Sequence, residues 1–299
     1  MTSLIPFFDE VEGMTARLAR ARVLFTDLDG TLLGRGASLL SDGQGRPTLD
    51  AVEAIVRLNA AGLPVVITSG RNAKQLREIT RLLDWADFIG ELGCVRSYDR
   101  AAREVYETGD WPAGALREGE TPYEAIRREG AVDLLRTRFP GLIEYHDPWH
   151  LDREVTHILR GNVPIPEAQA ALDELPLPVT IVDNGIIHPR KHGLVGVREI
   201  HAIHLVPTGA SKERSITAYL VDRGIARDEA LAIGDSAADV GMAGSVGLMA
   251  CVRNGLDDPR LVARASGREN VAATRAAFGS GWAEFAAAWA SARDAAARA

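Results

Sequence analysis

Short apolar runs alternate along the chain with longer segments in which apolar residues recur at helical spacing. Residues 23–26, 63–68 and 88–90 are apolar runs with the length of a buried strand. Between them, segments 48–61 and 73–83 carry apolar side chains at the three- and four-residue intervals of an amphipathic helix. This order predicts a parallel sheet covered on both faces, because crossover helices usually join parallel strands.

The pattern changes in the middle of the chain, where all seven histidines lie. Helical segments there mix with strand-like runs at 179–182, 185–188 and 201–204. Alternation of strands and helices then resumes, with a helix at 211–223 and strands at 230–233 and 245–250. We therefore predict an α/β fold, a Rossmann-like doubly wound parallel sheet core formed by residues 1–106 and 205–299, with an inserted α+β cap domain at 107–204.

The alanine-rich tail, residues 270–299, carries one aromatic stripe. Phe278, Trp282, Phe285 and Trp289 follow one another at helical intervals and so share one face of a helix. We expect this stripe to pack in the core, with a dimer contact as the alternative.

Composition and charge narrow the functional classes. The chain of 299 residues is 46% hydrophobic and has a formal net charge of −7, which argues against nucleic acids or anionic membranes as partners. Cys94 and Cys251 lie far apart and support neither a disulfide framework nor a paired-cysteine zinc site. Residues 1–10 show no targeting pattern, and no apolar stretch approaches the roughly 18 residues of a membrane span. We predict a cytoplasmic protein.

Acidic residues directly follow two of the predicted strands. Asp27 and Asp29 come after the first strand, in a loop that continues through Gly30 to Thr31, and Asp235 and Asp239 follow the strand at 230–233. Parallel strands deliver their carboxyl ends to one edge, so Asp27 and Asp235 would approach each other if their strands are neighbours. Close carboxylates repel unless a proton or cation lies between them, and Mg²⁺ favours such oxygen ligands.

Groups suited to binding phosphate accompany these acids. Ser69 ends the second strand and offers a hydroxyl together with the backbone N–H groups of Gly70 and Arg71. Lys212, at the start of a predicted helix, can supply the positive charge that a phosphate among carboxylates requires. Each group alone also has an ordinary explanation, Ser69 as a helix N-cap and Lys212 as a solvated side chain.

The ordered set closely resembles the haloacid dehalogenase (HAD) superfamily of phosphatases. The resemblance rests on Asp-x-Asp-Gly-Thr, Ser-Gly-Arg, a single Lys and Gly-Asp-x-x-x-Asp, and covers roughly residues 20–105 and 205–265. The long insertion between Ser69 and Lys212 is similar to that of the branch with a C2-type cap, subfamily IIB. That branch includes Cof-like phosphatases and the phosphatases of sucrose, trehalose and mannosylglycerate synthesis.

The resemblance implies a role for each motif residue. Asp27 would be the nucleophile and Asp29 the general acid and base. Mg²⁺ would be held by Asp27, Asp235 and the backbone carbonyl of Asp29. The phosphate would be held by Ser69, Gly70 and Lys212, with support from Thr31 and from Asp239, which would orient Lys212 or a metal-bound water.

The substrate implied is a small phosphate ester, of a sugar or a sugar-like compound. Candidate substrate contacts are Arg71 and the cationic run His188, Arg190 and Lys191, for which a solvated hairpin tip is the alternative. A second polar group could hydrogen-bond sugar hydroxyls or be ordinary surface, and it consists of Glu144, His146, His150 and Arg153. Neither the physiological substrate nor the oligomeric state follows from the sequence.

Two departures from the family pattern keep other functions open. Ala238 stands where many relatives have Asn, and Leu92 replaces the Asn of a frequent Glu-Asn-Gly-Ala stretch. A phosphomutase would share the nucleophile but return the phosphoryl group to the substrate. A catalytically retired HAD-fold binding protein is the alternative that is not an enzyme.

Overall fold

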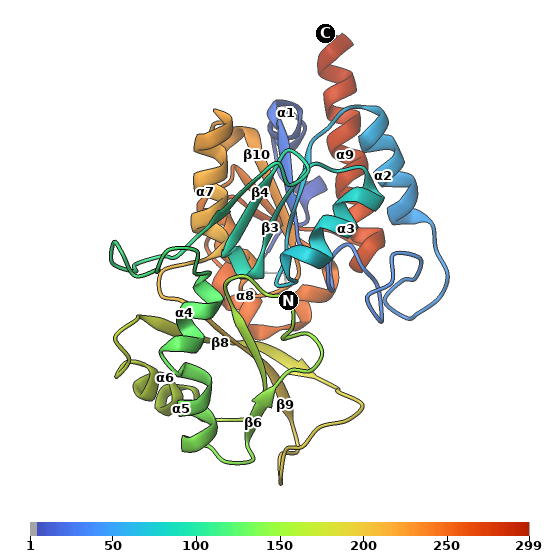
Figure 1. Ribbon diagram of the computed structural model, residues 1–299. Helices are drawn as coiled ribbons and strands as arrows, with labels where there is room; N and C mark the ends of the chain where they lie inside the picture. The colour runs from blue at the N-terminus through green and yellow to red at the C-terminus, as the bar shows by residue number, and fades with distance from the viewer. Residues whose placement is uncertain (1–4, 299) are drawn as a thin grey trace.

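Two β-sheets organise the chain (Figure 1). The computed structural model describes residues 5–298, so the first four residues of the segment predicted to lack a targeting signal lie outside the described part, as does residue 299. The larger sheet has the strand order β12-β11-β10-β1-β2-β3-β4-β5. Its strands are β1 (Val23–Thr26), β2 (Val65–Thr68), β3 (Asp87–Gly90), β4 (Val95–Tyr98), β5 (Arg103–Tyr106), β10 (Ala230–Gly234), β11 (Leu248–Cys251) and β12 (Val271–Ala273).

The first strand is central in this sheet. β1 pairs in parallel with β10 on one side and with β2 on the other, and Thr26 lies opposite both Ile233 and Ile67. The predicted α/β fold with a mostly parallel sheet is therefore confirmed. Only the β4 and β5 edge is antiparallel, a hairpin that the sequence pattern did not reveal. The loops after β1, β2 and β10 consequently leave the sheet at one edge.

Helices cover both faces of the larger sheet (Figure 1). Leu24 faces one apolar cluster, whereas Val23 and Phe25 face the other, because successive side chains of a strand point to opposite sides. The first cluster lies under α1 (Met14–Arg20), α2 (Asp50–Ala60), α3 (Ala73–Leu83) and α9 (Phe278–Arg298). The second lies under α7 (Lys212–Arg223) and α8 (Pro259–Ala265).

The aromatic stripe of α9 packs in the core, as expected. Trp282, Phe285 and Trp289 are all 0% exposed, and only Phe278 at the helix start is partly accessible. The indole N–H of Trp282 donates a hydrogen bond of 2.9 Å to the hydroxyl of Thr26. The last helix therefore reaches the final residue of the central strand.

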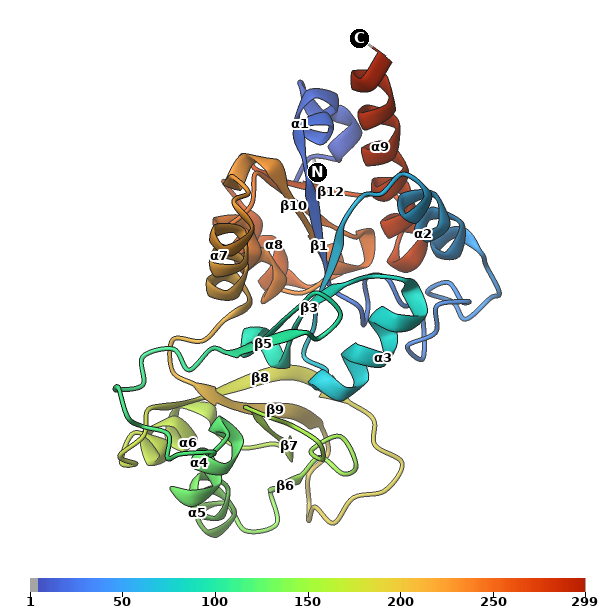
Figure 2. The ribbon, with the colours of Figure 1, turned by 45° about the horizontal axis from the view of Figure 1, so that its top comes forward.

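The inserted α+β part has an antiparallel sheet of strand order β6-β7-β9-β8, backed by helices on one face (Figure 2). Its strands are β6 (Ile143–Tyr145), β7 (His157–Gly161), β8 (Val179–Ile187) and β9 (Ile200–Pro207), and its helices are α4 (Pro122–Arg128), α5 (Ala131–Arg138) and α6 (Ile165–Leu172). The two strands predicted at 179–182 and 185–188 are one strand, β8, whose register shifts between Asp183 and Ile186. The face of this sheet without helices is turned toward the larger sheet (Figure 2).

The structure also bears on the predicted absence of a membrane span and on the state of the two cysteines. Among residues 5–298, no helix combines the length and the apolar character needed to cross a bilayer. Cys94 and Cys251 are buried free thiols.

Candidate active site

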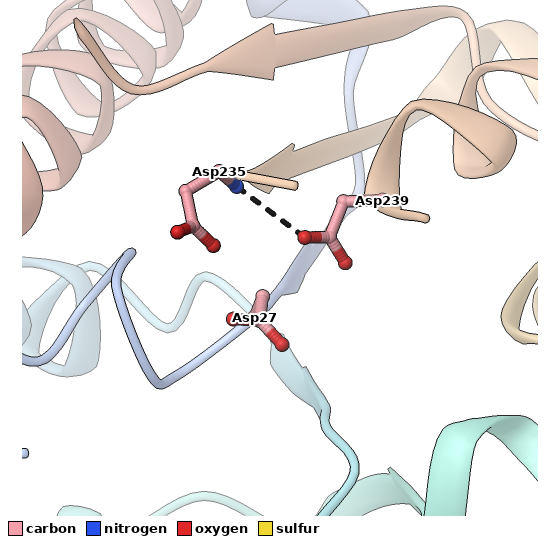
Figure 3. Close-up of side chains that lie close together, drawn as sticks. All are labelled: Asp27, Asp235 and Asp239. Atoms are coloured by element: carbon pink, nitrogen blue, oxygen red, sulfur yellow. Dashed lines mark hydrogen bonds between the residues drawn. The ribbon is translucent and has the colours of Figure 1, made fainter. Parts of the chain in front are cut away.

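Three aspartates meet where β1 and β10 end (Figure 3). Asp27 follows β1, Asp235 follows β10, and Asp239 begins the short helical turn after it. One carboxylate oxygen of each residue lies within 4.8 Å of the others. The parallel pairing of β1 with β10 is what brings these distant stretches of chain together.

The backbone of Asp27 is held on both sides. Its N–H donates to the carbonyl of Ile233 over 3.0 Å, which continues the β1–β10 pairing by one residue. Its carbonyl accepts a 2.7 Å hydrogen bond from the hydroxyl of Thr26, which in turn accepts from Trp282. A carboxylate mounted on this anchored backbone has little freedom to leave the cluster.

Lys212 supplies a positive charge inside the aspartate cluster. Its Nζ lies 2.8 Å from Oδ1 of Asp27 and 2.7 Å from Oδ1 of Asp239, and about 10% of its side chain is exposed. It is the first residue of α7, whose N-cap is the Ser211 side chain, bonded to the N–H of Arg214. Helix capping therefore orients the start of α7 toward the acids.

The loops around Asp235 and Asp239 are closely packed. The hydroxyl of Thr31 donates to Asp235 over 3.2 Å, and Asp239 accepts from the hydroxyl of Ser236 over 2.6 Å. Gly30 has a φ of +89°, and a Cβ there would lie 2.2 Å from an oxygen of Asp235. Only glycine permits both this left-handed conformation and this close approach.

Burial changes the protonation of the three acids. Burial raises the pKa of Asp27 to about 7, although Lys212 opposes the shift, and burial together with Asp27 and Asp239 also raises the pKa of Asp235. Burial acts the same way on Asp239, but Lys212 and Ser236 outweigh it and lower its pKa. One ammonium thus faces three carboxylates, and this oxygen-rich cluster with excess negative charge fits a hard divalent cation.

The loop after β2 lies beside this cluster and is braced from behind. Ser69 and Gly70 line the same cavity as Asp27, and Oγ of Ser69 accepts from the N–H of Arg71. The carbonyls of Ser69 and Arg71 accept from the N–H groups of Leu92 and Glu91. Glu91 and Leu92 have φ values of +51° and +62°, a conformation that costs non-glycine residues free energy and is retained here by surrounding contacts.

Asp29 points to a different partner from the other three acids. Its two carboxylate oxygens accept hydrogen bonds of 2.8 Å and 2.6 Å from the guanidinium of Arg71. Its side chain is 49% exposed, unlike those of Asp27 and Asp239. This bidentate pair holds the predicted acid and base at the wall of the cavity.

The buried carboxylate of Glu91 joins the larger sheet to the inserted part. Glu91 is 0% exposed, and its oxygens accept from the N–H groups of Glu154, Val155 and Thr156 over 2.7–3.2 Å. The neighbouring Arg153 places Nη1 3.6 Å from Glu91 and donates from Nη2 to the carbonyl of Gly70 over 2.9 Å. The inserted part is therefore tied both to the turn at Glu91 and to the loop after β2.

Replacing Glu91 by alanine should destabilise the protein by about 3–5 kcal/mol, because three N–H groups, two of them in buried contacts, lose their acceptor and a buried guanidinium loses its charge partner. Urea unfolding followed by circular dichroism would measure the loss. The exposed Glu78, paired with Arg81 on α3, offers a matched control, and Glu78→Ala should leave the unfolding midpoint unchanged. Equal midpoints for the two variants would show that Glu91 does not stabilise the connection between the larger sheet and the inserted part.

The aspartates, the loop after β2 and the inserted sheet enclose a cavity of about 620 Å³. Of the residues predicted for the site, it is lined by Asp27, Asp29, Ser69, Gly70, Arg71, Lys212, Asp235 and Asp239. Thr31 lies behind Asp235. The structure does not bring His188, Arg190 or Lys191 into this cavity, because all three are exposed in the connection that follows β8. Both family departures, Leu92 and Ala238, line the cavity.

Of the polar group in the inserted part that the sequence offers as sugar contacts, His146 and Arg153 line the cavity, whereas Glu144 and His150 do not. Two residues of the site, Glu91 and His204, are not among the candidates that the sequence provides. No local pattern marks His204, because the run Ile-His-Ala-Ile-His-Leu-Val does not alternate between polar and apolar residues. None marks Glu91 either, since its partners lie in a distant part of the chain.

Comparison with known proteins gives consistent matches. The chain matches the family model of haloacid dehalogenase-like hydrolases over residues 24–106 and 195–270, more than half of its length. It is 29% identical to a phosphoglycolate phosphatase of Methanospirillum hungatei JF-1 over 243 residues, which are 80% of this chain and 87% of that protein.

Solved structures share the fold at low sequence identity. A Thermoplasma acidophilum protein, 16% identical, aligns with a TM-score of 0.59 over 90% of this chain and 98% of its own. A phosphatase of the haloalkanoate (HAD) enzyme superfamily from Bacteroides thetaiotaomicron, 17% identical, aligns with a TM-score of 0.54 over 90% and 95%.

Proposed function

Since the chain belongs to the haloacid dehalogenase-like hydrolases and is a phosphatase, we propose that it hydrolyses a small sugar or sugar-like phosphate with Mg²⁺ through a phosphorylated Asp27. The observation that carries the proposal is the contact of Lys212 with both Asp27 and Asp239, beside Asp235, at the end of the central strand. This arrangement supplies a nucleophile, a compensating cation and oxygen ligands in one volume.

In the first half of the reaction, an oxygen of Asp27 attacks phosphorus and the bond from phosphorus to the leaving oxygen breaks. For this, Asp29 takes up a proton and turns from Arg71 toward the leaving oxygen. It then gives this proton to that oxygen, so that a neutral alcohol departs. Ser69, Gly70 and Lys212 hold the phosphoryl oxygens while the charge moves. Covalent capture replaces one difficult displacement by two easier ones.

In the second half, Asp29 takes a proton from water as the water oxygen attacks phosphorus. The bond between phosphorus and Asp27 breaks, which regenerates the carboxylate and releases inorganic phosphate. Asp27, Asp235 and the backbone carbonyl of Asp29 would hold Mg²⁺, whose charge reduces the repulsion between an anionic nucleophile and an anionic substrate.

The inserted sheet, proposed to be a cap formed by residues 107–204, covers the cavity opposite the aspartates. We propose that it excludes bulk water during the reaction and contacts the leaving group. The cytoplasmic location predicted from the sequence stays a prediction.

The function is tested by measuring phosphate release from p-nitrophenyl phosphate and a panel of sugar phosphates. Release is expected with Mg²⁺ and should fall at least about 100-fold when a chelator removes the metal, because charge stabilisation by a metal amounts to several kcal/mol. Conversion of a sugar phosphate to its isomer without phosphate release would instead indicate a phosphomutase. A folded protein inert toward the whole panel would overturn the proposal.

A further inference from the structure

Two histidines of the inserted part face the cavity and have no role in the mechanism above. His204 lies on β9 and is 1% exposed, and His146 directly follows β6. Both line the cavity that contains Asp27. Among residues 5–298, neither buried Nδ1 atom has a hydrogen-bond partner. Buried polar atoms are rarely left unpaired without a reason, which makes this pair a candidate for ligand contacts.

The alternation of side chains along β9 explains the position of His204. Ile203 and Leu205 belong to the apolar cluster under the helices of the inserted part, so His204 points to the opposite face. Its neighbour across the pairing with β7 is Ile158, which also lines the cavity. His146 donates its backbone N–H to the carbonyl of Ile158 over 3.1 Å. The two imidazoles therefore lie on the same face of one sheet.

Both imidazoles are uncharged near neutral pH. Burial, followed by Arg160 and Arg153, lowers the pKa of His146 to about 4. Burial, followed by Arg153 and His146, also lowers the pKa of His204. Each neutral ring offers one N–H donor and one nitrogen acceptor. A hydroxyl group has the same two capacities, whereas a carboxylate can only accept.

The cations that line the cavity are already paired with carboxylates. Arg71 binds Asp29 through two hydrogen bonds, and Lys212 binds Asp27 and Asp239. Arg153 is buried 3.6 Å from Glu91, and its donors bond the carbonyls of Gly70 and Trp149 and the hydroxyl of Thr156. On the wall that the inserted part contributes, Arg153 is the one cation among the residues that line the cavity, and Glu91 compensates its charge. A carboxylate beside His146 and His204 would thus meet no unpaired positive charge.

We propose that His146 and His204 bind hydroxyl groups of the leaving alcohol, so that the enzyme selects phosphate esters of polyols over phosphate esters that carry a carboxylate. This inference rests on the proposed phosphatase function and specifies its substrate class. A relative of this chain is named a phosphoglycolate phosphatase, and the alcohol released from phosphoglycolate bears a carboxylate. The proposed preference for polyol esters therefore distinguishes the substrate of this chain from the one in that name. Trp149, Ile158 and Ile187 line the same wall and would pack against the carbon skeleton.

The test compares kcat/KM for the hydrolysis of three phosphate esters in the presence of Mg²⁺. These are glycerol 3-phosphate, phosphoglycolate and p-nitrophenyl phosphate. The wild type is expected to prefer glycerol 3-phosphate to phosphoglycolate. His204→Phe and His146→Phe should each lower kcat/KM for glycerol 3-phosphate about 10- to 100-fold, since a buried hydroxyl loses its partner. Their kcat/KM for p-nitrophenyl phosphate should change less than about threefold, because this leaving group has no further hydroxyl.

The ratio of two kcat/KM values measured on one preparation does not depend on the folded fraction. His204→Gln keeps a donor and an acceptor and should restore part of the preference for glycerol 3-phosphate. His201→Gln is the matched control on β9, because His201 binds Asp183 and Glu199 outside the cavity. Preference for phosphoglycolate, or equal losses on all three esters, would overturn this inference while leaving the phosphatase proposal intact. Absence of turnover on every ester would overturn both.

Discussion

Replacing Asp27 by asparagine should lower kcat for p-nitrophenyl phosphate at least about 10⁴-fold, because the amide cannot form the phosphorylated intermediate. The side chain keeps its size, and the backbone contacts of residue 27 with Ile233 and Thr26 do not involve the carboxylate. The variant should therefore fold. Acid quenching of a reaction in progress should trap a phosphorylated protein for the wild type and none for Asp27→Asn.

Asp152→Asn provides the matched control for this change. Asp152 is exposed and pairs with Lys74 at the surface, away from the cavity lining. Its kcat should equal that of the wild type. Retention of more than about 1% of activity by Asp27→Asn would remove this residue from the nucleophile's role, since loss of a nucleophile costs far more.

Lys212→Met should lower kcat about 10³-fold, the loss expected when a buried group that stabilises developing charge is removed. The ammonium is the only cation within hydrogen-bond distance of Asp27 among residues 5–298. Without it, two carboxylates and a dianionic phosphate would share one enclosed volume. Steady-state kinetics with p-nitrophenyl phosphate and Mg²⁺ measures the effect.

The exposed Lys74 gives the comparison for this second change. Lys74→Met removes the same charge from a surface pair with Asp152 and should leave kcat unaltered. If Lys212→Met kept the activity of Lys74→Met, the ammonium would have no part in holding the phosphoryl group.

The sequence was most informative where strands end. β1, β2 and β10 are apolar runs that stop at polar residues, so Asp27, Ser69 and Asp235 were visible as candidates before their strands were known to be neighbours. The parallel pairing then brought them to one edge. Buried parallel strands are readable in this way because both of their faces must be apolar.

Local sequence patterns do not predict the contacts between the two sheets. In the sequence, Glu91 stands beside Leu92 in a stretch that departs from a family motif. Its carboxylate accepts hydrogen bonds from the N–H groups of residues 154–156, which no such motif indicates. β7 was missed because its sequence, His-Ile-Leu-Arg-Gly, has neither alternation nor a continuous apolar run. These contacts and this strand depend on how helices and strands pack against one another in the folded protein. Residue propensities and hydrophobic periodicity do not encode that packing.

The histidines of the inserted part include both conspicuous residues that lie at the surface and an inconspicuous one that lines the cavity. The dense cationic run at 188–192 is conspicuous in the sequence but lies at the surface. His204 was inconspicuous within an apolar run and faces the cavity. Which face of a strand becomes the lining of a site depends on which side the helices cover.

The central position of β1 has a consequence for the order of folding. During synthesis this strand emerges early, yet its partner β10 and the covering helix α9 follow only after the whole inserted part. The inserted sheet and its three helices are contiguous in sequence, so they can complete their own apolar cluster on the ribosome first. The edge of β1 that pairs with β10 therefore stays without its partner until the inserted part has been made, and an unpaired strand edge is prone to aggregate.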